Sequence, residues 1–416
     1  MTELDLDLKL LARRLAWSQG AATRLNVPLR AVVDRTRAGA AFQEFTDLDV
    51  LAVSHSPNSQ VHLDIFDCKT SSARSTERMF WLAGIVDLFH PDQAWLVRER
   101  GITEAARVLA ARLHLGTMSS DELEVMLRIH AGDASEHQAI RRLFDRTATV
   151  EYQNKLSNLD RRLRPLQESL RYDAWMVEPY QNLSMLPGAL GTSDVLVSDN
   201  PVHVAIVLDV AWLYMYALSH GAAYVARTGA VDVEARFSEF YLGGQAGKRD
   251  KEAVRDIFVR VTGHRDAHLL PDYFPNLLEV FGRLFISPRR VTEGMRYLEV
   301  VAAGVNAKKR PNLADAFGAA FDPVTAKLTG DVLNLLIGAA GLPPSFRSLF
   351  RGLLLGPPPE RSTATTAALA VESASTGADE APIGDAANTL TKDHAVGSAS
   401  IEATLDLDLP KDSREE

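Results

Sequence analysis

The sequence predicts an α/β unit with a mixed sheet flanked by helices, then a mainly α-helical region, then a disordered acidic tail. Three observations predict this order. Helical and strand-like patterns alternate over residues 1–130, and strand signals fade over residues 131–355. Residues 356–416 are poor in aromatic side chains and rich in Ala, Ser, Thr and acids, so they cannot bury enough apolar surface to fold.

Composition sets limits on the class of protein. The 416 residues are 46% hydrophobic, which suffices for more than one core, because a single core stops growing at about 250–300 residues. The lone cysteine, Cys68, excludes a disulfide framework, and the acidic N-terminus lacks a signal-peptide pattern. Residues 202–226 are long and apolar but include Asp209, which favours a buried helix over a membrane span. We therefore expect a cytoplasmic protein without a membrane partner.

Charge is concentrated in the tail. Residues 357–416 carry 12 acidic and 4 basic side chains, which leaves about −1 of the net charge of −9 for the rest of the chain. The overall charge therefore neither supports nor excludes a nucleic-acid partner, because local patches decide such binding.

The first elements are a helix, a second helical piece and a hairpin. A helix over residues 8–19 ends at Gly20, and a second helical piece is expected up to residue 37. Residues 48–53 and 61–69 have strand patterns and are separated by a polar loop. That arrangement predicts a β-hairpin.

A helix–strand alternation follows the hairpin. We expect a helix ending near Phe89, a strand over residues 93–97, a helix over 103–114 and a strand over 115–118. Ser119 and Glu122 have the spacing of a capping box, which predicts the start of the next helix. Strands joined through helices predict parallel neighbours in a mixed sheet.

The second region is expected to be helical without a repeat period. The segments with helical patterns are 135–146, 149–172, 202–226, 231–242, 249–262, 273–286, 288–305 and 331–355. Two basic clusters, 160–171 and 306–312, are candidate nucleic-acid contacts, although runs of charge are usually solvated faces.

Residues at the end of the second hairpin strand suggest a catalytic site. Side chains two apart share a face of a strand, so Asp67 and Lys69 lie together while Cys68 points to the other side as a small core residue. Asp49 on the paired strand can approach them. Two close carboxylates repel each other unless a cation intervenes, and Mg²⁺ or Mn²⁺ would resolve the conflict. Lys69 could then orient or deprotonate an attacking water.

These residues carry a family resemblance. TDLDVLAV, then IFDCK, a Ser-rich turn and the helix RMFWLAGIVDLF resemble the PD-(D/E)XK (restriction endonuclease-like) nuclease superfamily over roughly residues 8–128. The resemblance implies that Asp49 and Asp67 are metal ligands and that Lys69 is catalytic. Leu48 stands where the family name has proline, and the second acid is Asp instead of the commoner Glu.

Further residues are candidates beside this trio. The family's first helix often supplies an additional acid, for which Glu44 and Asp47 are the candidates here. Arg74 and Arg78 follow the motif at helical spacing, and they would either contact phosphate or form a solvated helix face.

We therefore expect a metal-dependent nuclease that hydrolyses phosphodiester bonds. DNA is the expected substrate, in restriction or defence, and RNA remains open. The helical region would select substrate, form a homodimer or bind a protein partner. The alternative is a catalytically inactive nuclease-like protein that binds nucleic acid or acts as a scaffold through its helical region.

Overall fold

The computed structural model describes residues 3–36, 39–70, 75–130, 137–229, 231–263 and 268–356. These residues belong to one compact unit that extends to Pro358. The tail expected from residue 356 onward lies outside the described residues, apart from Gly356.

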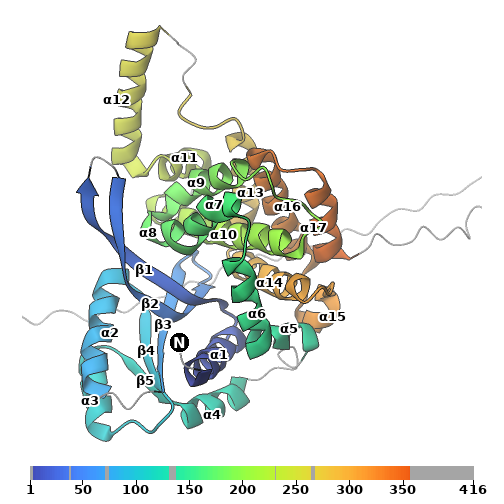
Figure 1. Cartoon of the computed structure of the whole chain (residues 1–416). Helices are drawn as coiled ribbons and strands as arrows, with labels where there is room; N and C mark the ends of the chain where they lie inside the picture. The colour runs from blue at the N-terminus through green and yellow to red at the C-terminus, as the bar shows by residue number, and fades with distance from the viewer. Residues whose placement is uncertain are drawn as a thin grey trace, which may run out of the picture. The chain divides into compact units, whose positions relative to one another are not determined.

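The first part of the chain contains five strands and four helices (Figure 1). The helices are α1 (Glu3–Ser18), α2 (Ser75–Phe89), α3 (Glu104–Arg112) and α4 (Ser120–His130). The strands are β1 (Ala22–Thr36), β2 (Gly39–His55), β3 (Val61–Lys69), β4 (Gln93–Arg98) and β5 (Gly116–Ser119).

The strands form one mixed sheet in the order β1-β2-β3-β4-β5. The pairs β1·β2 and β2·β3 are antiparallel, and β3·β4 and β4·β5 are parallel. Parallel neighbours need a crossover, and α2 and α3 provide the two crossovers. The expected mixed sheet with flanking helices is therefore confirmed.

The expectation of a helical piece before residue 37 is wrong. Residues 22–36 form β1, which pairs with a β2 that begins at Gly39, well before the expected start at residue 48. The β-branched Val27, Val32 and Val33 suit a strand. Pairing with β2, which is interrupted by two register shifts, supplies backbone hydrogen-bond partners that override the weak helical pattern.

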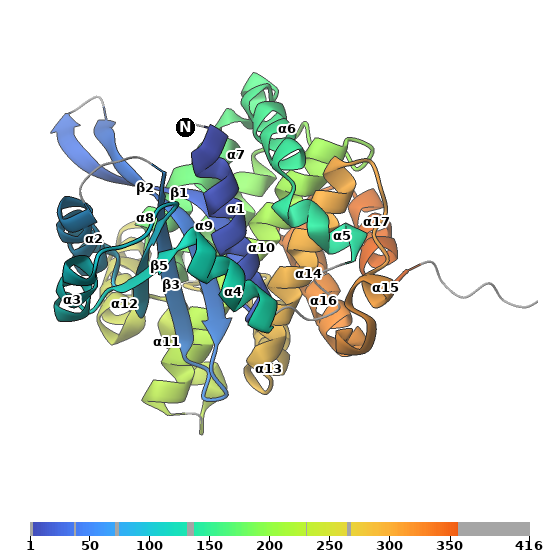
Figure 2. The same ribbon diagram turned by 90° about the horizontal axis from the view of Figure 1, so that it is seen from below.

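Opposite faces of the sheet pack against different helices (Figure 2). Apolar residues of α1 and α4, such as Leu15 and Leu123, pack with Phe66 and Cys68 in one cluster. Cys68 is fully buried there, as expected for a core residue. A second cluster contains Leu51 and Ile65 together with apolar residues of α2, α3 and the helical region. The alternation along β3 thus places consecutive side chains in different cores.

The capping box is confirmed at the start of α4. The Ser119 N–H donates to Glu122 Oε2 at 2.8 Å, and the Glu122 N–H donates to Ser119 Oγ at 3.3 Å. The bond from the Ser119 backbone and the Arg107 guanidinium lower the pKa of Glu122.

The rest of the described chain is helical, as expected. The longer helices are α6 (Arg146–Ser157), α9 (Pro179–Gly191), α10 (Pro201–Thr228), α11 (Val233–Tyr241), α12 (Gly244–Thr262), α13 (Phe274–Phe285), α14 (Arg289–Asn306), α16 (Pro323–Ala340) and α17 (Ser345–Leu355). The shorter ones are α5 (Gln138–Arg141), η2 (Arg142–Phe144), η3 (Arg161–Leu163), α7 (Arg164–Glu168), the π-turn η4 (Ser169–Asp173), α8 (Ala174–Met176), α15 (Leu313–Phe317) and η5 (Gly318–Ala320).

Helix boundaries differ from expectation where Gly and Pro intervene. Residues 331–355 were expected as one helix but are divided between α16 and α17, because Gly341 adopts φ +66° and Pro343 follows it. The helix α9 was not expected, since Pro187 and Gly188 interrupt its apolar pattern.

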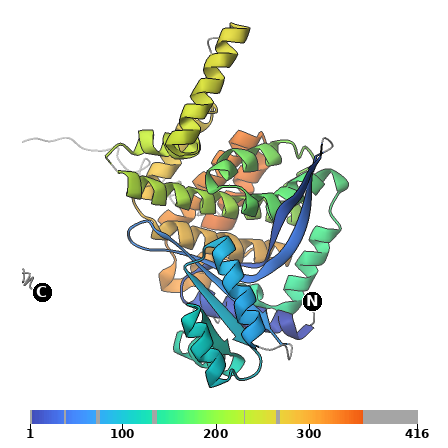
Figure 3. The ribbon, with the colours of Figure 1, turned by 90° about the vertical axis from the view of Figure 1, so that its left-hand side faces the viewer.

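Helix α10 lies at the centre of the helical region, and α12 extends away from it (Figures 1 and 3). Within the described residues, α10 alone is long and apolar enough to cross a membrane, yet 89% of its apolar window is buried inside the fold. This burial matches the expected central core helix.

Buried polar contacts tie the sheet to the helices. Glu299 of α14 accepts hydrogen bonds from the Thr23 N–H at 2.6 Å, Thr23 Oγ1 at 2.9 Å and Trp212 Nε1 at 3.0 Å. Arg13 Nη2 of α1 lies 3.4 Å from the same carboxylate. The change near residue 130 is therefore one of secondary structure, and the same compact unit continues across it.

Candidate functional site

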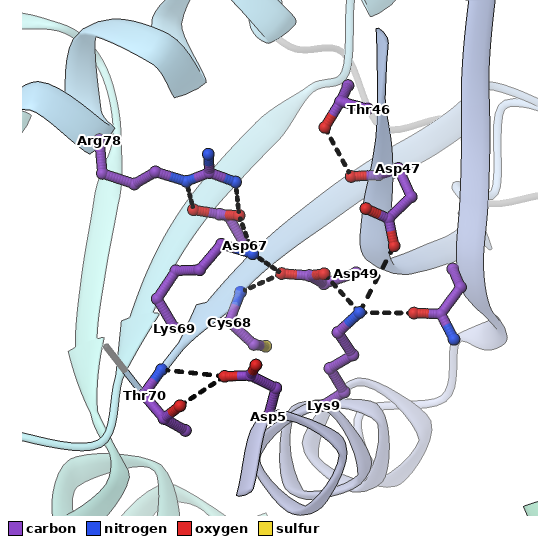
Figure 4. Close-up of polar contacts among 11 residues, drawn as sticks. Asp5, Lys9, Thr46, Asp47, Asp49, Asp67, Cys68, Lys69, Thr70 and Arg78 are labelled. Carbon is purple, nitrogen blue, oxygen red and sulfur yellow. Dashed lines mark hydrogen bonds and ion pairs between the residues drawn. The ribbon is translucent and has the colours of Figure 1, made fainter. Parts of the chain in front are cut away.

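The hairpin register brings the predicted trio together (Figure 4). Val50 pairs with Phe66, so Asp49 and Asp67 lie next to each other beyond the end of the β2·β3 ladder. Lys69 Nζ lies 3.1 Å from Asp49 Oδ2 and 3.4 Å from Asp67 Oδ1. The lysine thus bridges the two carboxylates, as the alternation along the strand predicts.

Both acids are buried. Asp49 is 1% exposed and Asp67 is 4% exposed, whereas the Lys69 side chain is 29% exposed. The Cys68 N–H donates to Asp49 Oδ2 at 2.7 Å, which fixes that carboxylate against the backbone of β3.

Lys9 of α1 is a member of the site that the sequence did not reveal. Its ammonium lies 2.6 Å from Asp49 Oδ1 and donates to Asn26 Oδ1 at 2.5 Å. The side chain is buried. The one available signal was a lysine within the apolar run of residues 8–11.

Asp5 of α1 was also missed. Its Oδ1 accepts hydrogen bonds from the Thr70 N–H at 3.3 Å and from Thr70 Oγ1 at 2.5 Å. Asp5 and Lys9 are four residues apart and therefore share one face of α1. That spacing could have placed both near the site once the helix was known to face the hairpin.

Arg78, a candidate phosphate contact, makes a bidentate contact with Asp67 in the structure. Its Nε and Nη2 donate to the two Asp67 oxygens at 2.6 and 2.5 Å, a bidentate geometry that is among the stronger hydrogen-bonded pairs. The guanidinium also lies 3.3 Å from the centroid of the Trp81 ring. Arg74 lies outside the described residues.

The two candidate additional acids occupy different surroundings. Asp47 borders the site, with its Oδ2 3.5 Å from Lys9 Nζ and its side chain 40% exposed. Glu44 is exposed and accepts a hydrogen bond from Tyr172 Oη at 3.2 Å, on the helical region.

Burial and neighbouring charges set the protonation of the site. Burial raises the pKa of Asp67, against the opposing effects of Arg78 and Lys69. Burial lowers the pKa of Lys69, but the carboxylates of Asp67 and Asp49 outweigh it and hold this pKa above its usual 10.5. Lys69 is therefore an ammonium at neutral pH, which makes it a hydrogen-bond donor and not a general base. Burial also raises the pKa of the Cys68 thiol well above 9.0, which leaves it protonated and unreactive.

Asp49 and Lys69 line a cavity of about 880 Å³, whose wall does not include Asp67. One side is formed by α1, β1 and β2, including Lys9 and Asp49. The other side is formed by helices of the second region, among them α6, α10 and α14. The cavity therefore depends on both halves of the fold.

The carboxylates suit a divalent cation by donor type, because Mg²⁺ prefers oxygen ligands and needs only one or two carboxylates. Their surroundings compete with such an ion. Lys9, Lys69 and Arg78 place three positive charges against the two carboxylates. No group of three or more His, Cys, Asp or Glu side chains is arranged for a metal within the described ranges. A divalent ion would therefore have to displace the Lys9 ammonium from Asp49.

Comparisons with protein-family models, curated proteins and solved structures find no significant match to this chain, so its function is inferred from the site itself.

Proposed function

We propose that the chain is a metal-dependent nuclease in which Asp49 and Asp67 take Mg²⁺ or Mn²⁺ and Lys69 acts on the reacting phosphate. The observation that carries the proposal is the Lys69 ammonium, 3.1 and 3.4 Å from two buried carboxylates at the edge of a large cavity. DNA is the proposed substrate, in restriction or defence against foreign DNA.

The strand framework supports the finer assignment to a restriction endonuclease-like fold. A helix, an antiparallel three-strand unit, a helix and a parallel strand follow one another, with one acid on the second strand and an acid-x-lysine on the third. An acid and an acid-x-lysine on neighbouring hairpin strands, followed by a helix and a strand, are what the resemblance to PD-(D/E)XK nucleases implies.

The chain's own residues have distinct tasks in this proposal. The Cys68 N–H holds Asp49 in place, and the bidentate Arg78 guanidinium holds Asp67, both on rigid strands. Lys69 stays protonated, so it offsets the negative charge that develops on the phosphoryl oxygens and orients the attacking water. A bound divalent ion would supply Lewis acidity and a water of lowered pKa.

A second candidate is a nuclease-like module that binds nucleic acid or partners without cleavage. The observation that favours it is the compensation of Asp49 and Asp67 by Lys9, Lys69 and Arg78, which already neutralises both carboxylates without a metal.

One experiment separates the two candidates. The full chain is incubated with plasmid DNA, single-stranded DNA and RNA in Mg²⁺, Mn²⁺ or a chelator, and ion binding is measured by calorimetry. A nuclease cleaves only with the metal, and Lys69→Ala lowers the rate about 10²-fold or more, because a positioned catalytic cation is lost. The matched control is Lys327→Ala, an exposed lysine of α16, which should retain full activity. Absence of both cleavage and metal binding would support the module instead.

A further inference from the structure

The cavity beside the trio constrains which nucleic acid can reach it. We infer that the substrate strand enters as a single strand that occupies this cavity, an inference that rests on the proposed nuclease function. The chemistry of the trio alone does not determine whether the substrate is single- or double-stranded, whereas the cavity does.

Enclosure is the first argument. Asp49 and Asp67 are almost fully buried, and Lys69 is the partly exposed member of the trio. Helices of the second region form the side of the cavity that faces the sheet. A volume of about 880 Å³ lies in the range of pockets that enclose a single small-molecule ligand, roughly 300–1,000 Å³. It admits a short stretch of one strand, whereas a duplex would have to remain outside the helices.

The apolar lining is the second argument. Ile206 and Leu213 of α10 and the half-buried Trp175 of α8 contribute to the wall. Trp175 is supported from behind by Trp212 and Tyr216, with ring centroids 6.3 and 5.8 Å away. In a duplex the faces of the bases are stacked on one another, so only an unpaired strand can offer bases to such a surface.

Cations on the helical side are the third argument. Arg142 is half-buried at the wall, and its guanidinium has no hydrogen-bond or ion-pair partner in the part of the chain that the structure describes. Arg171, from the basic cluster at residues 160–171, also lines the cavity. Both groups line the same cavity as Asp49 and Lys69, where phosphates of a threaded strand would need counter-charge.

The charge balance adds a condition on binding. Seven acidic and seven basic side chains line the cavity. A lining without net charge does not attract a polyanion over distance, so a divalent ion bound at Asp49, which lines the wall, is needed to make the cavity positive. Binding of the strand is therefore expected to depend on a divalent cation.

The test compares strands of one sequence on the full chain. Labelled single-stranded DNA, the same sequence as RNA, blunt duplex DNA and a duplex with a single-stranded overhang are used. Anisotropy is measured in Ca²⁺, a hard cation that takes oxygen ligands, and cleavage is measured in Mg²⁺. We expect at least tenfold tighter binding of the single strand than of the blunt duplex and loss of that binding in chelator. Cleavage of the duplex with an overhang should be confined to its overhang.

Substitutions in the cavity wall test whether the preference for a single strand over a duplex arises there. Trp175→Leu removes the stacking surface and should weaken single-strand binding about tenfold, as loss of one stacked base does. Arg142→Gln should also weaken it, and the half-buried, unpartnered side chain makes this variant safe for folding. The matched control is Arg112→Gln, an exposed arginine of α3 away from the cavity, which should bind as the wild type does.

The possible outcomes separate the preference for a single strand from the nuclease activity. Cleavage of blunt duplex at a rate equal to or above that of the single strand overturns the inference and leaves the nuclease proposal standing. Absence of cleavage of every substrate overturns the nuclease proposal, and the anisotropy then still decides strandedness: equal binding of both forms, or of neither, overturns the inference.

Discussion

Asp49 is central to the charge balance of the site. Its Oδ1 faces the Lys9 ammonium at 2.6 Å, and its Oδ2 accepts from the Cys68 N–H and from Lys69. A carboxylate that is 1% exposed needs such partners to replace its lost hydration. Lys9 thus supplies counter-charge to one of the two carboxylates that we propose as metal ligands.

Replacement of Lys9 should expose this competition. Lys9→Met removes the ammonium and keeps the aliphatic bulk, so Asp49 loses one buried partner. We expect the free energy of unfolding without divalent ions to fall by about 3 kcal/mol, the lower end for breaking a buried ion pair, because Lys69 remains. Mn²⁺ should restore much of this loss and bind more tightly than to the wild type. Thermal unfolding with and without Mn²⁺, together with calorimetric titration, measures both effects.

The matched control is Lys327→Met at an exposed position, which should change neither quantity. Equal Mn²⁺ affinity in Lys9→Met and the wild type would show that Lys9 does not compete with the ion.

Part of this residue-scale geometry was readable from the sequence. The two-residue period of β3 placed Asp67 and Lys69 on one face, and the hairpin brought Asp49 to them. The contact of Lys9 with Asn26 was not readable, because it depends on how α1 packs and on the positive φ of Asn26, 52°. Arg78 was placed near the site by helical spacing, but its bidentate contact with Asp67 depends on where α2 lies relative to β3.

At the scale of elements, the parallel part of the sheet depends on a close approach between β4 and β5. Trp95 pairs with Gly116 in the register, and its indole ring covers the position that a Cβ of Gly116 would take. Trp95 also stacks on Phe66 of β3, with ring centroids 6.4 Å apart. The glycine therefore lets one large ring lie flat across three strands.

Gly116→Ala should destabilise the sheet. The added methyl overlaps the Trp95 ring, so either the ring or β5 must move, and overpacking of this kind costs about 1–3 kcal/mol. Chemical denaturation measures the change in the free energy of unfolding. Gly101→Ala is the control, because a Cβ there meets nothing within 4 Å. The explanation would fail if Gly116→Ala were as stable as the control.

Elements were predicted best where one local signal dominated. The hairpin, α2, β4 and α3 followed from alternation, helical period and turns, and the capping box fixed the start of α4. The strand β1 was missed because its pairing with β2 is a tertiary effect that local pattern does not contain. The break between α16 and α17 carried a Gly-Leu-Pro-Pro signal that the apolar pattern on both sides obscured.

At the scale of the molecule, polar residues from distant parts of the chain join the sheet to the helices. Glu299 binds Thr23 and Trp212, and Arg24 Nη1 lies 2.6 Å from Asp209 Oδ1 of α10. The carboxylate of Asp209 also accepts from Tyr152 Oη. Partners separated by more than 180 residues cannot be paired from one sequence, so the shared core of the two halves and the cavity between them were not predicted.

Two histidines within this fold should make its stability depend on pH. Burial lowers the pKa of His55 in β2 to about 3 and that of His220 in α10 to about 4, from the usual 6.5. The Nε2 atoms of both rings are buried without a hydrogen-bond partner among the described residues. Below pH 6.5 the two histidines take up protons in the unfolded chain, whereas burial keeps them neutral in the folded chain. Stability present above pH 6.5 is therefore lost as the pH falls toward 4, by at most about 1.4 kcal/mol per pH unit for each histidine.

Urea denaturation across this range should give a shallower pH slope for His220→Gln and for His55→Gln than for the wild type, because each removes one such proton. Lys327→Gln, at an exposed position of α16, leaves every histidine in place and should keep the wild-type slope. If all three variants kept it, proton uptake by the buried pair would not be the cause.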